Sequence, residues 1–471
     1  MIDLPFNPFD RELAELETRE LAKLESVAEG WYVEYKREVV ELKKIAKSLA
    51  AFANHYGGWL FYGIAQSADG SNVAGAFPGI PKSQVADCLE RVRNAAKCHM
   101  NPAPYYEYKE LEGPCPEISL PQDRSVIAIA VPCGPCTPYI HSDGRIYRRI
   151  ADTSDPKPET DRFILDQLWQ HRQLAQDKLK TFLKKTPVLS KGESETSFVH
   201  LFLFIDPLGA SGQRAELTFD RFRELMSKPQ SFGLELSLPF DNFFTMSDGL
   251  VCRQIGINSP FNMVLTWGYY SNGSALISIP VSSWRVPLAD YSHPSDKVSF
   301  FDGYEHGPDT IGYLKGAKYD AGYLLDINNL FFGVSATIAQ YGKLAEESGL
   351  KGQIYAKAVT ENTWRRIPFL DTKSYLRHVA ENGFPLIQFD KEFAPPGDTF
   401  ESLRIIDPNE KLDGLPPGYS VLLKAAPFLA DIVHALGVPK EVMFDKSGEW
   451  IEAANRAHRI SMKRAEDATT S

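Results

Sequence analysis

The chain of 471 residues lacks several features that would assign it to a class at once. Its formal net charge of −10 gives no overall support for nucleic-acid binding, which would need a local basic patch. Six cysteines are too few to suggest a disulfide framework in a chain of this length. No apolar stretch reaches the roughly 18 residues of a membrane span, and Met1 to Asp10 lacks the basic start and apolar run of a signal peptide. We therefore expect a cytoplasmic protein with no membrane partner.

What is present is typical of a globular protein. Hydrophobic residues make up 43% and charged residues 24% of the chain, which supplies ample material for a core. At roughly 100–200 residues per domain, the length predicts two or three domains. There is no internal repeat, no low-complexity tract and no G-x4-G-K-[S/T] segment of the kind that forms a P-loop.

Hydrophobic periodicity predicts a mixture of helices and strands, and hence an α+β fold. The expected helices are residues 12–25, 38–53, 82–97, 162–185, 328–348, 421–436 and 447–465. The expected strands are residues 31–36, 59–64, 125–131, 144–150, 198–206, 262–269 and 275–281. A polar stretch near residues 190–197 precedes aromatic-rich strands. We therefore expect a domain at residues 10–175, a linker at 176–197 and a larger α+β part of unknown fold at 198–471.

One group of charged residues lies around the first expected strand. Glu29 and Glu34 are five residues apart, and hard carboxylate oxygens of this kind suit Mg²⁺ or Mn²⁺. The period of two places Lys36 on the same strand face as Glu34, where it would hold a phosphate or offset carboxylate charge. We expect these three residues to face a shared, partly exposed groove. A solvated, charged strand face is the alternative.

Three further groups carry candidate chemistry. Asn54 and the pair Gly57-Gly58 end a helix, and the glycines either form a turn or let the backbone approach a phosphate. Arginines in the expected strand 144–150 either contact phosphate or pair with carboxylates: Arg145, Arg148 and Arg149. Thiolates and imidazole are proper zinc ligands, and the sequence offers Cys98, His99, Cys133 and Cys136. The alternative for the last two is a tight Cys-Gly-Pro-Cys turn.

Together these segments resemble the AlbA_2 domain of Schlafen proteins. That pattern runs E-x4-E-F/Y-K, a helix, A-F-A-N-x-x-G-G-x-L-x-x-G-I/V, a D-G turn and a later tyrosine-arginine strand. The chain matches it in order and spacing at Glu29, Glu34-Tyr35-Lys36, Ala51–Asn54, Gly57-Gly58, Leu60, Gly63-Ile64, Asp69-Gly70 and Tyr147-Arg148. The resemblance covers about 140 residues and does not extend beyond about residue 175.

The resemblance implies a nucleic-acid-binding domain. The candidate nucleic-acid contacts of this chain are Lys36, Asn54, Gly57, Gly58, Arg145, Arg148 and Arg149. Animal members with ribonuclease activity imply three metal-binding carboxylates, two of which fall on Glu29 and Glu34. The third position lines up with Gln66, a departure for which Asp69 is the candidate replacement. The family's zinc site is similar in placement to the Cys98-His99 and Cys133–Cys136 pairs.

Three functions follow as alternatives. The first is an RNA- or DNA-binding protein with a regulatory or defence role, whose C-terminal part binds an unknown partner. The second is a metal-dependent ribonuclease acting on structured RNA, which Gln66 disfavours. The third is a regulatory protein that only mediates association, which the net charge favours. Since animal Schlafen cores have two related lobes and this chain has one copy of the pattern, a homodimer is also expected.

Overall fold

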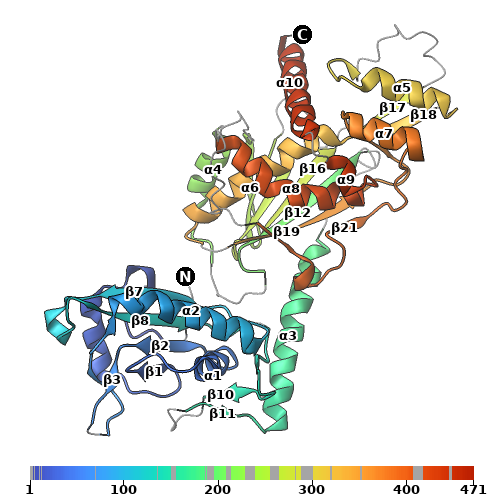
Figure 1. Cartoon of the computed structure of the whole chain (residues 1–471). Helices are drawn as coiled ribbons and strands as arrows, with labels where there is room; N and C mark the ends of the chain where they lie inside the picture. Colours follow the sequence, from blue (N-terminus) through green and yellow to red (C-terminus); the bar gives the residue numbers. More distant parts are fainter. Residues whose placement is uncertain are drawn as a thin grey trace. The chain divides into compact units, whose positions relative to one another are not determined.

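The structure is a computed structural model that describes most of the chain. The described residues are 4, 6–9, 11, 13–68, 70–134, 136–149, 155–185, 187, 196–207, 214–228, 239–254, 265–281, 283–287, 301–318, 321–350, 353–406, 417–444 and 448–470. The chain divides into two compact units, of which the N-terminal unit is Met1–Leu179 with Leu208–Gln213 and the C-terminal unit is Lys180–Pro207 with Arg214–Ser471. Both mix helices with strands, so the chain has an α+β fold (Figure 1).

The N-terminal unit is built on one mixed sheet. Its strands are β1 (Val33–Lys36), β2 (Gly58–Tyr62), β5 (Ile80–Pro81), β7 (Glu107–Glu112) and β8 (Arg124–Val131). The order is β1-β2-β8-β5, with β7 also paired to β8, and only β1 and β2 run parallel. Short pairs complete the unit: β3 (Ala65–Gln66) with β4 (Ala74–Ala76), β6 (Met100–Asn101) with β9 (Ile140–His141), and β10 (Tyr147–Arg148) with β11 (Lys157–Pro158).

Both faces of this sheet are buried. One face packs against the helices α1 (Leu42–Ala53) and α2 (Lys82–Cys98), and the other against the 3-10 helices η1 (Leu13–Glu15) and η2 (Thr18–Ser26). The turn η3 (Pro116–Ile118) and the long helix α3 (Arg162–Leu183) follow. Burial on both faces explains why β8 reads as a continuous apolar run in the sequence.

The edge of the sheet at β1 is closed by side chains instead of another strand. Within the described residues, β1 pairs with β2 alone. The carboxylate of Glu29 accepts the outward N–H of Tyr35 at 2.5 Å, and Arg149 Nη2 donates to the Val33 carbonyl at 3.3 Å. Because these backbone groups already have hydrogen-bond partners, they do not pair with a strand of another molecule, and the edge is protected from such pairing.

The C-terminal unit contains a larger antiparallel sheet. Its strands are β12 (Ser197–Phe204), β13 (Asn242–Met246), β14 (Gly249–Arg253), β15 (Thr266–Tyr270), β16 (Ala275–Val281), β19 (Ile354–Glu361), β21 (Glu392–Ala394) and β22 (Arg404–Ile406). Their order is β13-β14-β15-β16-β12-β19-β21, and β22 also pairs with β19. A second sheet has β18 (Ala321–Asp326) between β17 (Ser283–Pro287) and β20 (Ile367–Phe369).

Helices cover the large sheet on one face. The helices of this unit are α4 (Phe219–Ser227), α5 (Gly307–Gly316), α6 (Ile327–Glu347), α7 (Lys373–Asn382), α8 (Pro417–Ala435), α9 (Lys440–Met443) and α10 (Glu449–Thr470), with the turn η5 (Phe400–Ser402). Figure 1 shows α6 and α8 lying across β12, β16 and β19. Alternate residues of β12, among them Val199, Leu201 and Leu203, point into the core that these helices form with the sheet.

Most of the elements expected from periodicity are present. The expected helices at 82–97, 162–185, 328–348, 421–436 and 447–465 correspond to α2, α3, α6, α8 and α10. The segment 12–25 forms 3-10 helices instead of one α-helix, and the segment 38–53 becomes helical only at Leu42, because Glu41 is an extended N-cap. Helix α3 runs through the first part of the expected linker. No helix in the described ranges is long and apolar enough to cross a membrane.

Candidate functional site

Glu34 sits in a buried ion pair and does not line an exposed groove. Its side chain is 1% exposed, and Arg149, which is 0% exposed, donates to its Oε2 at 2.6 Å. Lys36 Nζ lies 2.9 Å from the other oxygen, Oε1, and the Ser48 hydroxyl of α1 donates to that same oxygen at 2.9 Å. Both carboxylate oxygens are thus occupied by protein donors. This corrects the expectation of a shared, partly exposed groove.

Glu29 is also held by the protein. Besides the Tyr35 N–H, its carboxylate accepts a hydrogen bond from the side-chain amide of Gln66. Burial is the largest influence on its pKa, which is raised above the ordinary value, although the Tyr35 N–H and Lys36 act in the opposite direction. Glu29, Glu34, Lys36 and Arg149 together carry two negative and two positive charges, so this cluster is close to neutral.

The residues that were candidates for a divalent metal do not fit one as they are placed. Gln66, at the position of the family's third carboxylate, presents an amide donor to Glu29 where a metal ligand would present an oxygen. Asp69, the candidate replacement, lies outside the described residues. Within the described ranges, no three His, Cys, Asp or Glu side chains converge in a way that could hold a metal ion.

The three arginines have different environments. Arg149 is wholly buried, with its guanidinium 4.8 Å from the Phe52 ring centroid, so it is not the phosphate contact that the sequence suggested. Its burial follows from the neutralisation of Glu34, which a buried carboxylate requires. Arg148 pairs with Glu159 at 2.6 Å and is partly buried. Only Arg145, in the turn between β9 and β10, is exposed.

Asn54, Gly57 and Gly58 shape the turn from α1 to β2. The Asn54 amide donates to the carbonyls of Tyr139 and Tyr147, at 2.8 and 3.2 Å, and its oxygen accepts the Tyr139 N–H. Gly57 has φ +77°, and a Cβ there would lie 2.7 Å from the Val131 carbonyl oxygen. A Cβ on Gly58 would lie 2.4 Å from the Phe52 ring. The protein itself fills the space on the Cβ side of both buried glycines, which explains why this turn needs glycine at these positions.

The four candidate zinc ligands lie in different local environments. Cys98 is exposed at the end of α2, and His99 Nδ1 is 3.0 Å from the Ser142 hydroxyl. Cys133 and Cys136 are partly buried, and the Cys136 N–H donates to the Tyr139 hydroxyl. In the part of the chain that the structure describes, they do not assemble into a metal site. Zinc binding stays a prediction without support from this geometry.

His55, at the end of α1, stacks on Trp31 with ring centroids 5.0 Å apart. Burial lowers the pKa of His55 to about 4, and Arg148 acts in the same direction while Glu159 opposes it. Because the unfolded chain has the ordinary pKa near 6.5, it takes up the proton first as the pH falls. The contribution of His55 to stability is therefore complete above about pH 6.5 and is lost as the pH falls towards about 4.

We expect His55→Phe to flatten this part of the pH profile, because phenylalanine keeps an aromatic ring and binds no proton. Allowing for solvent screening of a half-buried ring, the wild-type protein should lose about 1 kcal/mol more than the variant between about pH 7 and about pH 4.5. Urea unfolding at both pH values measures the difference. Parallel profiles for the two proteins would contradict the assignment.

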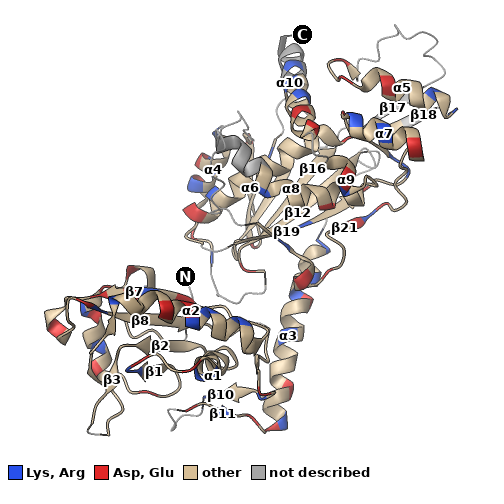
Figure 2. Ribbon diagram, viewed as in Figure 1, with Lys and Arg blue, Asp and Glu red and all other residues tan. Residues whose placement is uncertain are grey.

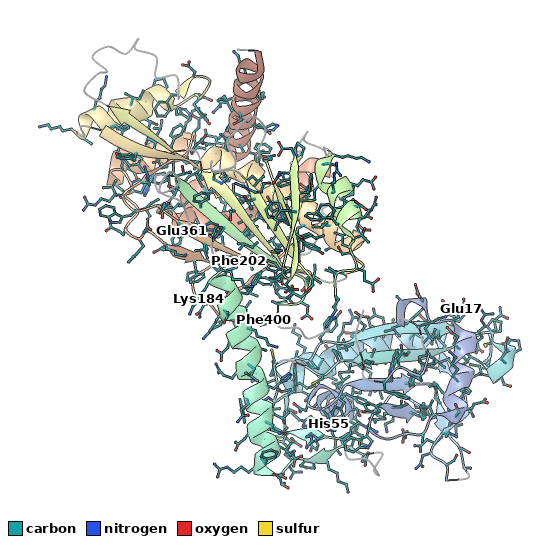
Figure 3. The ribbon with its side chains drawn as sticks, turned by 180° about the vertical axis from the view of Figure 1, so that it is seen from behind. Glu17, His55, Lys184, Phe202, Glu361 and Phe400 are labelled. Carbon is teal, nitrogen blue, oxygen red and sulfur yellow. The ribbon has the colours of Figure 1, made fainter. Side chains whose placement is uncertain are left out.

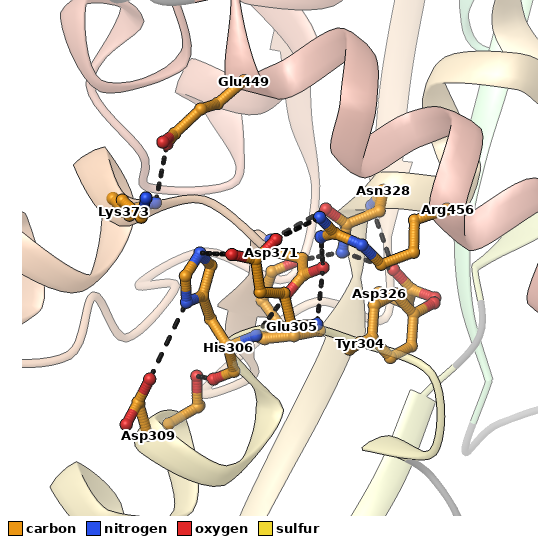
Figure 4. Close-up of polar contacts among 12 residues, drawn as sticks. Tyr304, Glu305, His306, Asp309, Asp326, Asn328, Asp371, Lys373, Glu449 and Arg456 are labelled. Atoms are coloured by element: carbon orange, nitrogen blue, oxygen red, sulfur yellow. Dashed lines mark hydrogen bonds and ion pairs between the residues drawn. The ribbon is translucent and has the colours of Figure 1, made fainter.

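The C-terminal unit contains a buried polar network that sequence reasoning missed (Figure 4). Asp326 precedes α6 and accepts from the Asn328 N–H at 3.0 Å and from the Tyr304 hydroxyl. Asp371 accepts the His306 N–H at 2.7 Å and pairs with Arg456 of α10. The network joins segments that are far apart in the chain. Its polar groups bond to one another, which is the arrangement of a structural cluster.

A second buried chain of side chains lies in the large sheet. His200 Nδ1 is 2.9 Å from the Ser278 hydroxyl, and His200 Nε2 is 2.9 Å from the Glu361 carboxylate. The residue types and contacts match those of a serine hydrolase triad. However, His200 is fully buried and Ser278 lies in the middle of β16, paired with β12, so a substrate has no access to the hydroxyl. Cross-strand satisfaction of a buried histidine explains this arrangement.

Comparisons with known proteins identify the N-terminal region. A family model described as "Schlafen, AlbA_2" matches residues 29–158. No curated protein matches the chain. Among solved structures, the DIP2311 protein from Corynebacterium diphtheriae is 14% identical, with a TM-score of 0.18, over 35% of this chain and 26% of that chain. This TM-score is too low to indicate a shared fold. The family match agrees with the pattern that begins at Glu29 and ends after Tyr147-Arg148. Residues 29–158 are therefore a Schlafen AlbA_2 domain, a family linked to nucleic-acid binding, in the N-terminal part of this 471-residue chain.

Proposed function

We propose that this chain binds RNA or DNA through its AlbA_2 domain, with basic side chains around α1 contacting the phosphate backbone. The proposal rests on the exposure and the lack of carboxylate partners of three lysines, Lys43, Lys44 and Lys47. All three lie on α1 with solvent access, and no carboxylate in the described parts of the chain is within ion-pair distance of them. Surface cations without a carboxylate partner are the usual partners of phosphates.

Arg145 extends this basic surface. Helix α1 packs beside β9 and β10, and His141 Nε2 is 3.1 Å from the Lys43 carbonyl oxygen. Lys47 Nζ lies 5.1 Å from the Tyr147 ring centroid. The turn that carries Arg145 is thus held against the helix that carries Lys43 and Lys47. We call these three residues the basic strip.

The whole-chain charge does not oppose this proposal. Acidic and basic residues are interspersed over the ribbon of each unit (Figure 2). At ionic strengths near 0.15 M, charges more than about 8 Å apart in solvent are largely screened, so a phosphate responds to the nearest side chains.

The ribonuclease alternative has less support. It requires carboxylates that are open to a metal ion, whereas Arg149 and Lys36 occupy the oxygens of Glu34 and Gln66 occupies Glu29. A metal would have to displace these donors and leave Arg149 buried without a partner, which is costly. Binding without cleavage needs no such rearrangement. A homodimer stays a prediction, for which light scattering is the measurement.

The test is incubation of the full chain with labelled tRNA and single-stranded DNA, with and without Mn²⁺. We expect a complex whose affinity falls as salt rises, and intact nucleic acid in every lane. Mn²⁺-dependent cleavage would contradict this proposal and support the metal-dependent ribonuclease instead. Absence of both binding and cleavage would leave the protein as one that only mediates association.

A further inference from the structure

A continuous group of aromatic rings lies at the end of α1 and the entry to β1. Phe6 stacks on Tyr32 with centroids 5.4 Å apart, and Tyr32 lies 6.0 Å from Tyr56. Tyr56 lies 5.9 Å from Trp31 and 3.8 Å from His55. Figure 3 labels His55 among the side chains of this unit. Three chain segments therefore bring five rings into contact.

These rings are open to solvent, unlike the aromatic core beneath them. Tyr56 is 48% exposed and the other four are partly exposed. The neighbouring core rings Trp59 and Phe61, by contrast, are 2% and 0% exposed. A contiguous apolar group on the surface of a folded unit marks a binding site more often than an isolated exposed ring does.

Rigid structure holds the rings in place. The Tyr32 carbonyl accepts the Trp59 N–H at 2.6 Å, which fixes the entry to β1 against β2. On the other side, the Asn54 hydrogen bonds and the turn at Gly57 fix the direction of His55 and Tyr56. Preformed aromatic faces lose little conformational freedom when a flat ligand stacks on them.

Cations adjoin the aromatic group. The side chain of Asn54, which precedes His55 in the chain, donates to the Tyr147 carbonyl at 3.2 Å, and the Tyr147 ring lies under Lys47 of the basic strip. The basic strip and the aromatic rings therefore meet along β10 and α1. Sites for single-stranded nucleic acid usually combine aromatic rings, on which bases stack, with neighbouring cations that contact the phosphates.

We propose that Trp31, Tyr32, His55 and Tyr56 form a platform on which unpaired bases of a single-stranded nucleic acid stack. The inference rests on the proposed function and specifies its ligand, because bases in a duplex are already stacked on one another. The four residues occupy unspecified positions of the family pattern: two in E-x4-E and two in A-F-A-N-x-x-G-G. The platform is therefore a property of this chain beyond the domain it carries.

The adjoining cations favour this occupant over an apolar protein segment. A peptide that buried only aromatic surface would gain nothing from the basic strip, whereas each nucleotide brings a phosphate together with a flat base. A protein partner is then one of the outcomes of the test.

The experiment compares three probes of equal length, each of about 20 nucleotides: oligo(dT), an abasic strand with the same phosphates, and a duplex. Binding of the abasic strand reports on the basic strip alone. We expect the wild-type chain to bind oligo(dT) about tenfold more tightly than the abasic strand, since stacking adds to backbone contact for each engaged base.

The variants are Tyr56→Ala, Tyr56→Phe and the control Tyr108→Ala, whose ring is 50% exposed on β7 away from the platform. Tyr56→Ala should weaken oligo(dT) binding about tenfold and leave the abasic strand and the salt dependence unchanged. Tyr56→Phe should retain wild-type affinity, which shows that the ring and not the hydroxyl acts. Melting temperatures of all three variants exclude unfolding as the cause.

The two proposals fail in different ways. Equal affinity for oligo(dT) and the abasic strand, or equal weakening of both by Tyr56→Ala, would overturn the platform and leave backbone binding standing. Binding of no probe at all would overturn the proposed function and the platform with it. A change of mass in light scattering on Tyr56→Ala, with nucleic-acid affinity unchanged, would show that the rings contact a protein instead.

Discussion

Arg149→Ala is expected to destabilise the N-terminal unit by about 3 kcal/mol. The variant leaves the Glu34 carboxylate buried, with Lys36 and Ser48 as its remaining partners. It also removes the donor to the Gly30 and Val33 carbonyls. A buried anion that loses its principal counter-charge costs far more than an exposed pair of the same kind.

Hydrogen exchange in increasing urea measures this effect unit by unit. Amides of β1 and β2 report on the N-terminal unit, while amides of β12 in the C-terminal unit are an internal reference that should not change. Arg145→Ala removes an exposed arginine close in sequence and should stay within about 0.5 kcal/mol of the wild type.

A second variant separates the lost charge from the lost volume. Replacing both partners, as Glu34→Leu with Arg149→Met, removes the buried charges together and should recover most of the stability. A loss in the double variant as large as in Arg149→Ala would show that packing against Phe52, and not the charge, is what matters. A loss below about 1 kcal/mol in Arg149→Ala would contradict the burial of Glu34.

Replacing Lys43 and Lys47 together by alanine is expected to weaken nucleic-acid binding about 30-fold at about 0.1 M salt. The two lysines are one helical turn apart, so they contact one side of a strand. Each lost phosphate contact reduces the slope of log affinity against log salt by about 0.7 for a single strand. Fluorescence anisotropy across a salt series gives both quantities at once.

The control is an equivalent pair on the neighbouring helix. Arg93 and Lys97 are also four residues apart and exposed, but they lie on α2, outside the basic strip. Arg93→Ala with Lys97→Ala should leave both affinity and salt slope near the wild-type values. Equal losses in the two double variants would indicate general attraction to a positive surface and would contradict a defined site.

Several residues of the family pattern have a structural role in this chain. Glu34 is a buried partner of Arg149, Glu29 closes the edge of β1, and Asn54 and Gly57 shape one turn. Each is explained by the fold without a ligand. Residues of the pattern are thus poor guides to the ligand in this chain, whereas Lys43, Lys47 and Tyr56 lie on the surface, where a ligand can reach them.

The sequence by itself determined the elements and the identity of the N-terminal domain. The period of apolar residues predicted α2, α3 and α6, because burying one face of a helix imposes that period whatever the partner is. The spacing of Glu29, Glu34-Tyr35-Lys36 and the two glycines pointed to the Schlafen AlbA_2 domain, because the pattern of that family has the same residues in the same order.

Only the tertiary structure decided which charged residues are free. Arg145, Arg148 and Arg149 are close together in the sequence and chemically alike, yet one is exposed, one is paired and one is buried, because the environment of each depends on Glu34 and Glu159 elsewhere in the chain. Likewise Trp31 and Tyr56, which are 25 positions apart, share a surface only because α1 returns the chain to β1. Local periodicity contains no information about such distant partners, since a side chain's burial is set by what packs over it.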